Sequence, residues 1–259
     1  MAYFFNNFPL FLLVMARLSS MLLIVPFFSN KNIPLVFKAL ICFFLTLVII
    51  PLVVEKNLKL GSLHEIFFPV LLQEIGIGLF IGFVVLVIFT GFQLAGQFFS
   101  LQIGFDFSEV IDPFSQKSFP LFSQLKYLIG LLVFLAIDGH HLLIKALYNS
   151  YELIPIFKAK GIVLDGLLKY LAYSFQAMFI IALKIALPVM ILLFFASVSL
   201  GLISRILPQV EIMIFSFPIK IIATFLIIMV AAPFFVKTMQ ISLEKMFDFL
   251  NKILFSWPG

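Results

Sequence analysis

The chain has 259 residues, of which 63% are apolar and 11% are charged, and its formal net charge is +5. Soluble domains carry roughly 45–50% apolar and about 25% charged residues. Because the mean hydropathy is +1.22, too few polar side chains are present to cover a water-facing surface, and we predict an integral membrane protein. The positive charge then indicates cytoplasmic loops and anionic lipid headgroups, and we expect no binding of nucleic acid.

Six long apolar runs follow one another with short polar segments between them: Phe8–Phe28, Ile33–Val54, Ile66–Phe99, Tyr127–Tyr148, Tyr170–Ile203 and Ile206–Val236. A helix needs about 20 residues to cross a ~30 Å hydrocarbon core. The third and fifth runs are too long for one simple crossing and too short for two, so these helices either project beyond the bilayer or fold back as short hairpins. We predict an all-α, polytopic membrane protein of long helices and helical hairpins, with one integral membrane domain over residues 1–259.

Charged residues lie near the middle of several runs, at Arg17, Asp138, Lys184 and Lys220. Each costs about 2.5–3.5 kcal/mol at the bilayer centre if it faces lipid. Lys38, Glu74 and Glu211 lie nearer the run ends, where snorkelling relieves this cost. The central set holds three cations and one anion, so these residues cannot all form ion pairs with one another. Either the runs lie outside bilayer depth, or neighbouring subunits supply carboxylates. Both explanations favour a chain that is a subunit of an assembly. The residues expected in buried or inter-subunit charge pairs are Arg17, Glu74, Asp138, Lys184 and Lys220.

The third run also carries glycines that let helix backbones approach closely, at Gly76, Gly78, Gly82, Gly91 and Gly96. Gln93 and Gln97 share one face of the same helix and would be costly toward lipid, so we expect this helix to be surrounded by protein.

The few reactive side chains give no support to enzymatic chemistry. Cys42 is the single cysteine, and the three histidines and twelve carboxylates are mostly scattered. His140 and His141 follow Asp138 and Gly139, and a hydrogen-bonded histidine at a helix break is the commoner role than a proton shuttle. We expect no catalytic residue, no cofactor and no metal site.

The connector 101–124 mixes bulky apolar side chains with three carboxylates, and Pro113 and Pro120 exclude a continuous helix. Non-helical backbone at membrane depth must be buried in protein or line an aqueous path. The connector is either a plug, since hydrophobic constrictions gate by excluding water, or an ordinary loop packed on the membrane surface.

The segment Val236–Leu254 is amphipathic, with Met239, Leu243, Met246, Leu250 and Leu254 at helical spacing. An interfacial helix is the simpler hypothesis, and a docking face for a partner is the alternative. Lys237, Lys245 and Lys252 indicate that this tail is cytoplasmic.

Several short motifs follow in a fixed order: Gln102-x-Gly104, Asp112-Pro113, Pro120-Leu121-x-x-Gln124, Gly139-His140, Gly201-x-x-x-Arg205-x-x-Pro208-Gln209 and Phe217-Pro218. Together, and over essentially the whole chain, they resemble the FliR family of flagellar export-gate proteins, which has homologues in virulence type III secretion systems. The pattern is closer to the flagellar members. The sequence departs from the family at Asp138, where an asparagine is common, and at Glu211.

The resemblance implies a non-enzymatic channel subunit of the flagellar type III protein export gate, in the bacterial inner (cytoplasmic) membrane at the flagellar basal body. It implies FliP-like and FliQ-like subunits and further export-apparatus proteins as partners in a helical channel assembly, and unfolded flagellar proteins as substrates. Residues 1–165 then form N-terminal helices with the plug-like loop 101–124, residues 166–236 a FliQ-like hairpin, and residues 237–259 the amphipathic tail.

The resemblance also implies roles for individual residues. The cytoplasm-side turn contains Arg205, Pro208 and Gln209. The plug of the channel contains Phe105, Phe107, Ile111, Asp112, Pro113, Phe114, Phe119 and Pro120. Two hypotheses of other classes stay open, namely a proton-coupled secondary transporter that uses Asp138, His140 and Lys184, and a scaffold that seeds assembly without lining a pore. A transporter would show inverted repeats, and we find no convincing repeat.

Overall fold

The computed structural model describes residues 8–29, 33–56, 63–104, 121–156, 164–206 and 212–255. All regular structure in these ranges is helical: α2 (Phe8–Ile24), α3 (Pro26–Ser29), α4 (Leu35–Lys56), α5 (Leu63–Ile103), α7 (Leu121–Ala136), α8 (Gly139–Leu153), α9 (Leu164–Ile206) and α10 (Ile212–Phe255). The predicted all-α class is therefore confirmed.

Three helices of the described ranges are long and apolar enough to cross a membrane, over Phe67–Ile103, Leu168–Ile206 and Phe215–Phe255. The pair α7 and α8 counts as a fourth crossing if it is taken as one broken span. The long runs do not fold back as hairpins, because α5 and α9 are continuous helices of 41 and 43 residues. At 1.5 Å per residue α9 is about 65 Å long, about twice the thickness of a hydrocarbon core.

Two breaks in the helices were not evident from hydropathy. The first run divides at Val25, where Pro26 begins α3, since proline is well accommodated at the first position of a helix. The apolar run Tyr127–Tyr148 is not one continuous helix: it divides at Ile137 and Asp138 into α7 and α8, which are bent by 70° and form one crossing only as a broken span. Asp138 has φ 55° and ψ 34°, and this left-handed conformation cannot continue a right-handed helix.

The chain forms two compact units. Unit 1 contains Met1–Val87, Asp138–Phe175 and Glu244–Gly259, and unit 2 contains Ile88–Ile137 and Gln176–Leu243. The helices α5, α9 and α10 each contribute residues to both units.

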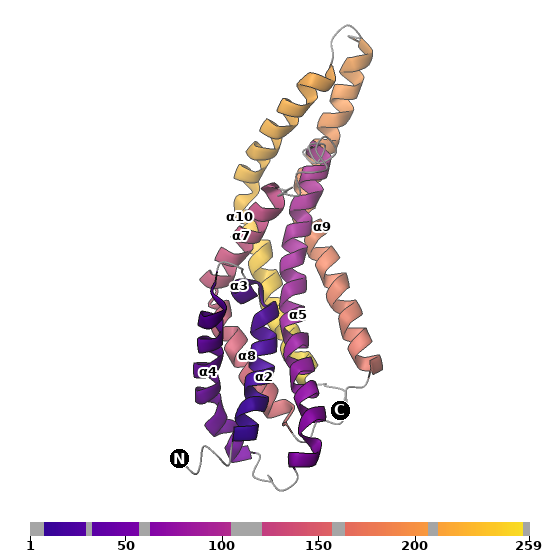
Figure 1. Ribbon diagram of the computed structural model, residues 1–259. Coiled ribbons are helices and arrows are strands. Elements are labelled where there is room, and N and C mark those ends of the chain that lie inside the picture. The colour runs from indigo at the N-terminus through magenta and orange to yellow at the C-terminus, as the bar shows by residue number, and fades with distance from the viewer. Residues whose placement is uncertain are drawn as a thin grey trace, which may run out of the picture. The chain divides into compact units, whose positions relative to one another are not determined.

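In unit 1, α2 lies beside α4 and beside the first part of α5 (Figure 1). Glycine on α5 permits the second contact: a Cβ at Gly78 would collide with the backbone oxygen of Arg17 and with Ser20 Oγ, and one at Gly82 would lie 2.9 Å from Met21 O. The close approach expected of these small residues is confirmed.

In unit 2, the second part of α5 packs against three helices. A Cβ at Gly96 would lie 2.5 Å from the backbone of Phe122 on α7, and one at Gly91 would lie 3.1 Å from Met178 O on α9. The ring of Phe99 packs beside that of Phe235 of α10, with centroids 6.3 Å apart and the ring planes tilted by 43°. The expectation that this helix is surrounded by protein holds only in part: 67% of its most apolar window is buried, against 39% for α9 and 11% for α10, but Gln97 is exposed.

The C-terminal tail is neither a separate helix nor a free amphipathic face. It continues α10 through Val236 without a break. The predicted apolar stripe is buried within the chain, with Met239 and Leu243 fully covered and Met246, Leu250 and Leu254 at most 2% exposed. In unit 1, Phe249 of this segment stacks on Tyr173 of α9. An interfacial or docking role for this stripe is therefore wrong, because the chain's own helices cover it.

Candidate functional site

A buried arginine of α2 forms hydrogen bonds to two other helices of unit 1. Arg17 of α2 is 0% exposed, and Glu74 of α5 is 1% exposed. The pair is bidentate: Arg17 Nε donates to Glu74 Oε2 at 2.6 Å, and Nη2 donates to Oε1 at 2.9 Å. Two parallel hydrogen bonds of this kind fix the relative orientation of the guanidinium and the carboxylate, as well as neutralising both charges.

The remaining donors of Arg17 reach α8 and the residue that follows it. Nη1 donates to Ser150 Oγ at 3.0 Å, and Nη2 donates to the backbone oxygen of Ile154 at 3.1 Å. The centroid of the Tyr151 ring lies 4.2 Å from the guanidinium carbon, and the Tyr151 hydroxyl donates to Val14 O at 3.1 Å. Four of the five N–H donors of the guanidinium are thus used, so the charge is buried with its hydrogen bonds satisfied.

Arg17 and Glu74 are both among the residues predicted to form buried or inter-subunit charge pairs, and the structure pairs them within the chain. The separate prediction that snorkelling relieves the charge of Glu74 is wrong. Glu74 was assigned to a run end, where snorkelling would relieve its charge, and the anions were counted only among residues central in the runs. In the structure Glu74 is buried and faces Arg17. Sequence position along a run does not give depth in the folded chain, because α5 packs against α2 at Gly78 and brings the two side chains together.

A second buried cation, Lys126 on α7 in unit 2, was missed at the sequence level. It is 0% exposed, and its Nζ has no hydrogen-bond partner among the described residues. The ammonium group lies 3.4 Å from the centroid of the Phe235 ring and 5.3 Å from that of Phe99. Its only favourable electrostatic contacts in the described part of the chain are therefore aromatic faces.

The signal that marks Lys126 is helical periodicity. The buried positions of α7 are Phe122, Ser123, Lys126, Gly130, Val133 and Phe134. Lys126 falls on this buried stripe at spacings of three and four residues, although it precedes the apolar run at Tyr127.

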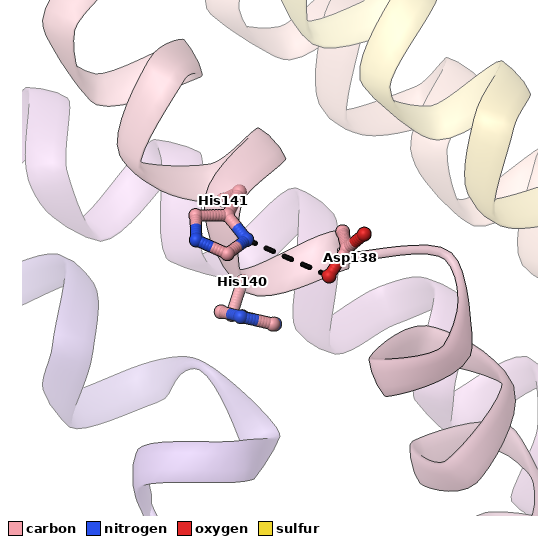
Figure 2. A group of neighbouring side chains, drawn as sticks. All are labelled: Asp138, His140 and His141. Atoms are coloured by element: carbon pink, nitrogen blue, oxygen red, sulfur yellow. Dashed lines mark ion pairs between the residues drawn. The ribbon is translucent and has the colours of Figure 1, made fainter.

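Asp138 lies at the break before α8, beside two histidines (Figure 2). Its side chain is 74% exposed, so the expected buried acid is not found, because the break turns this residue out of the packed surface. The carboxylate oxygen Oδ1 lies 3.6 Å from His141 Nδ1, and the rings of His140 and His141 have centroids 4.2 Å apart. The break itself agrees with the expectation of histidines at a helix break.

The other predicted charge-pairing residues are not buried. Lys184 is exposed on α9 and Lys220 is half-buried on α10, and neither forms an ion pair with a carboxylate of the described ranges. A transporter centre of Asp138, His140 and Lys184 is not assembled within one unit, because Lys184 belongs to unit 2 and the other two to unit 1.

The remaining predicted residues concern the connector and the turn. Arg205 is exposed at the end of α9, where a basic side chain complements the helix dipole. Pro208 and Gln209 lie outside the described residues. The same holds for all the predicted plug residues: Phe105, Phe107, Ile111, Asp112, Pro113, Phe114, Phe119 and Pro120.

Long apolar helices, glycine-mediated packing and a satisfied buried ion pair define the class of the molecule as a polytopic helical membrane protein. A family model described as bacterial export proteins, family 1, matches residues 8–246. The flagellar biosynthetic protein FliR of Bacillus subtilis (strain 168) is 33% identical over 224 residues, which cover 86% of each chain. The corresponding protein of Borreliella burgdorferi is 31% identical over 92% of this chain and 89% of its own, and that of Escherichia coli K12 is 25% identical over 93% and 91%. The chain belongs to this family of bacterial export proteins, the FliR family.

Proposed function

We propose that this chain is a channel-forming subunit of the flagellar type III protein export gate, which passes unfolded flagellar proteins across the bacterial cytoplasmic membrane. Membership of the FliR family supports a place in the flagellar export apparatus. The proposal extends this to a channel shared with FliP-like and FliQ-like subunits at the flagellar basal body. The region 166–236 takes the place of the FliQ-like hairpin in it.

The observation that carries the proposal is the large apolar surface of α9 and α10 that the chain does not cover. Only 11% of the most apolar window of α10 is buried, and α10 has 44 residues. Helices of about 65 Å exceed a ~30 Å hydrocarbon core, so lipid can cover only part of them. The rest of this surface requires other protein subunits, since large apolar patches in water favour association.

The lysines of this surface support the same conclusion. Lys184 is exposed within a predominantly apolar helix, and facing lipid at the bilayer centre would cost about 2.5–3.5 kcal/mol. A carboxylate from a neighbouring subunit would remove this cost. Lys220 on α10 is half-buried and takes the same role at the subunit interface.

The proposed mechanism is passive sealing by the connector. Its apolar side chains, among them Phe105, Phe107, Ile111, Phe114 and Phe119, close the pore to water and ions and move aside when a substrate enters. The support for this step is the composition of the connector and its place between two apolar helices.

Co-expression with the FliP-like and FliQ-like subunits tests the seal. Replacing residues 105–119 by a glycine/serine segment of equal length should make the membrane permeable to small solutes while the complex, weighed by native mass spectrometry, still assembles. Unchanged permeability in an assembled complex would contradict the plug. Failure to assemble would favour the scaffold hypothesis.

The native mass of the unaltered complex tests the assembly itself. One copy of this chain in a larger particle with both partner types is expected. A monodisperse single chain that moves a small solute unaided would contradict the proposal. The D138N variant distinguishes the transporter hypothesis from the export gate. A proton-coupled transporter should lose its transport activity in this variant, whereas the export gate should keep its export activity.

A further inference from the structure

The break between α7 and α8 brings together three metal-ligating side chains that the export function does not use. One ligand atom each from Asp138, His140 and His141 lies within 4.8 Å of the others. Figure 2 shows the two imidazoles next to each other and the Asp138 carboxylate facing His141. We propose that these residues bind a divalent first-row transition-metal ion, with Zn²⁺ the best-suited ion.

The distance between Asp138 and His141 fits a coordination shell better than a direct hydrogen bond. Oδ1 and Nδ1 are 3.6 Å apart, whereas an N–H···O hydrogen bond spans 2.7–3.2 Å. Metal–ligand bonds of about 2.0–2.2 Å in a tetrahedral site place neighbouring donor atoms about 3.3–3.6 Å apart. A cation can therefore lie between these two atoms with little movement of either side chain.

The backbone holds the three side chains in place. The Asp138 carbonyl accepts hydrogen bonds from His141 N at 2.9 Å and Leu142 N at 3.2 Å, which fixes the first turn of α8. Asp138 is the N-cap residue, yet its side chain makes no capping hydrogen bond. An aspartate in this position usually accepts from the first backbone N–H groups of the helix. Here the left-handed backbone leaves the carboxylate free to act as a ligand.

His140 supplies a second, independent indication of a missing partner. Its Nδ1 is buried and has no hydrogen-bond partner among the residues that the structure describes. Buried polar nitrogens are usually satisfied, and coordination of an ion by His140 Nδ1 would give this atom the partner that the described residues do not supply.

The donor set selects the class of ion. Two imidazoles and one carboxylate suit Zn²⁺ and its neighbours, whereas Ca²⁺ and Mg²⁺ prefer oxygen ligands. The partial positive charge at the start of α8, about half a unit, opposes a cation, but the full negative charge of Asp138 outweighs it. Asp138 and His141 are 74% and 71% exposed, so water or a partner's side chain can occupy the fourth position.

Cobalt binding to the purified full-length chain, with any affinity tag removed, tests the site. Co²⁺ gives visible absorption bands when it occupies a tetrahedral site. We expect saturation at one Co²⁺ per chain, displacement by equimolar Zn²⁺, and no displacement by excess Mg²⁺. H140A, H141A and D138N should each weaken Co²⁺ binding at least ten-fold. H64A, at the chain's third histidine, is the matched control and should bind as the unaltered chain does.

Two results would overturn the site. One is the absence of saturable Co²⁺ binding to the folded chain, and the other is unchanged affinity in the H140A/H141A double variant. The reactivity of the buried Cys42 thiol, which should match that of the unaltered chain, verifies that each variant is folded. Metal binding is measured without export, so failure here leaves the proposed channel function unaffected.

Discussion

Unit 1 and unit 2 each bury one cation completely, and they treat it in different ways. In unit 1 the guanidinium of Arg17 makes two hydrogen bonds to Glu74 and two more to Ser150 and Ile154. In unit 2 the ammonium of Lys126 faces the rings of Phe235 and Phe99 and has no hydrogen-bond partner in the described ranges. Equal burial therefore does not mean equal stabilisation, because the cost of burying a charge depends on what replaces water around it.

In spite of this difference, both units use glycines to bring helix backbones into close contact. Gly78 in unit 1 and Gly96 in unit 2 both allow a helix backbone to touch α5 where no Cβ would fit. Substitutions of the buried charges should therefore change the free energy of unfolding differently in the two units, whereas substitutions of the packed glycines should change it similarly. Unfolding can be followed for both by circular dichroism in detergent, and for unit 1 by dye labelling of Cys42, which is 5% exposed.

The largest effect is expected for R17M. The substitution removes the cation and leaves the Glu74 carboxylate buried without its partner, which costs about 3–5 kcal/mol of the free energy of unfolding. The thermal midpoint should fall and Cys42 should label faster. The double variant R17M/E74M should recover most of the loss, because no unpaired charge remains. If the double variant were as unstable as R17M alone, the ion pair would not be the cause.

G78A and G96A should come next, with similar losses in the two units. Each added methyl group meets backbone atoms of a neighbouring helix, and overpacking of this kind costs about 1–3 kcal/mol. Thermal unfolding of both variants measures the loss. A large effect for one variant and none for the other would show that the two glycine contacts are not equivalent.

K126M should act in the opposite direction to R17M. It removes a buried amine that has no hydrogen-bond partner in the described ranges, and it keeps an unbranched apolar chain of similar length. Loss of the aromatic contacts offsets part of the gain, so we expect the free energy of unfolding to rise by about 1 kcal/mol. A fall of more than this amount would mean that Lys126 has a stabilising partner beyond the described residues.

The smallest effect is expected for G201A, the control for the packed glycines. A Cβ at Gly201 of α9 meets nothing within 4 Å. Alanine in a helix interior is favoured over glycine, so the variant should gain about 0.5 kcal/mol. A clear loss in the isolated chain would indicate that glycine is needed there for a reason other than space.

Several features could be predicted because they depend on local composition. Long runs of apolar residues can satisfy their backbone groups in a membrane only as helices, so the all-α class followed from hydropathy alone. The glycines of α5 predicted its close packing, because only a residue without a side chain lets backbones touch. Histidines after Asp138 and Gly139 indicated a helix break, although the apolar run Tyr127–Tyr148 extends across it.

Other features could not be predicted, because they depend on contacts between distant segments. The amphipathic stripe of the tail was correctly placed on one helix face, but nothing local showed that the same chain would cover it. Lys126 precedes the apolar run at Tyr127, so its burial was not predicted. Glu74 was predicted to take part in a charge pair, but its place near the end of a run indicated neither its partner nor its burial.

The amino-acid sequence by itself determined that this protein is a helical membrane protein, and its motifs pointed to the FliR family. Tertiary structure alone decided which charges meet. Arg17 and Glu74 are 57 residues apart, and they pair because Gly78 lets α2 lie against α5. Hydropathy is a property of each residue, whereas the neutralisation of a buried charge is a property of the pair, and only the fold determines the pair.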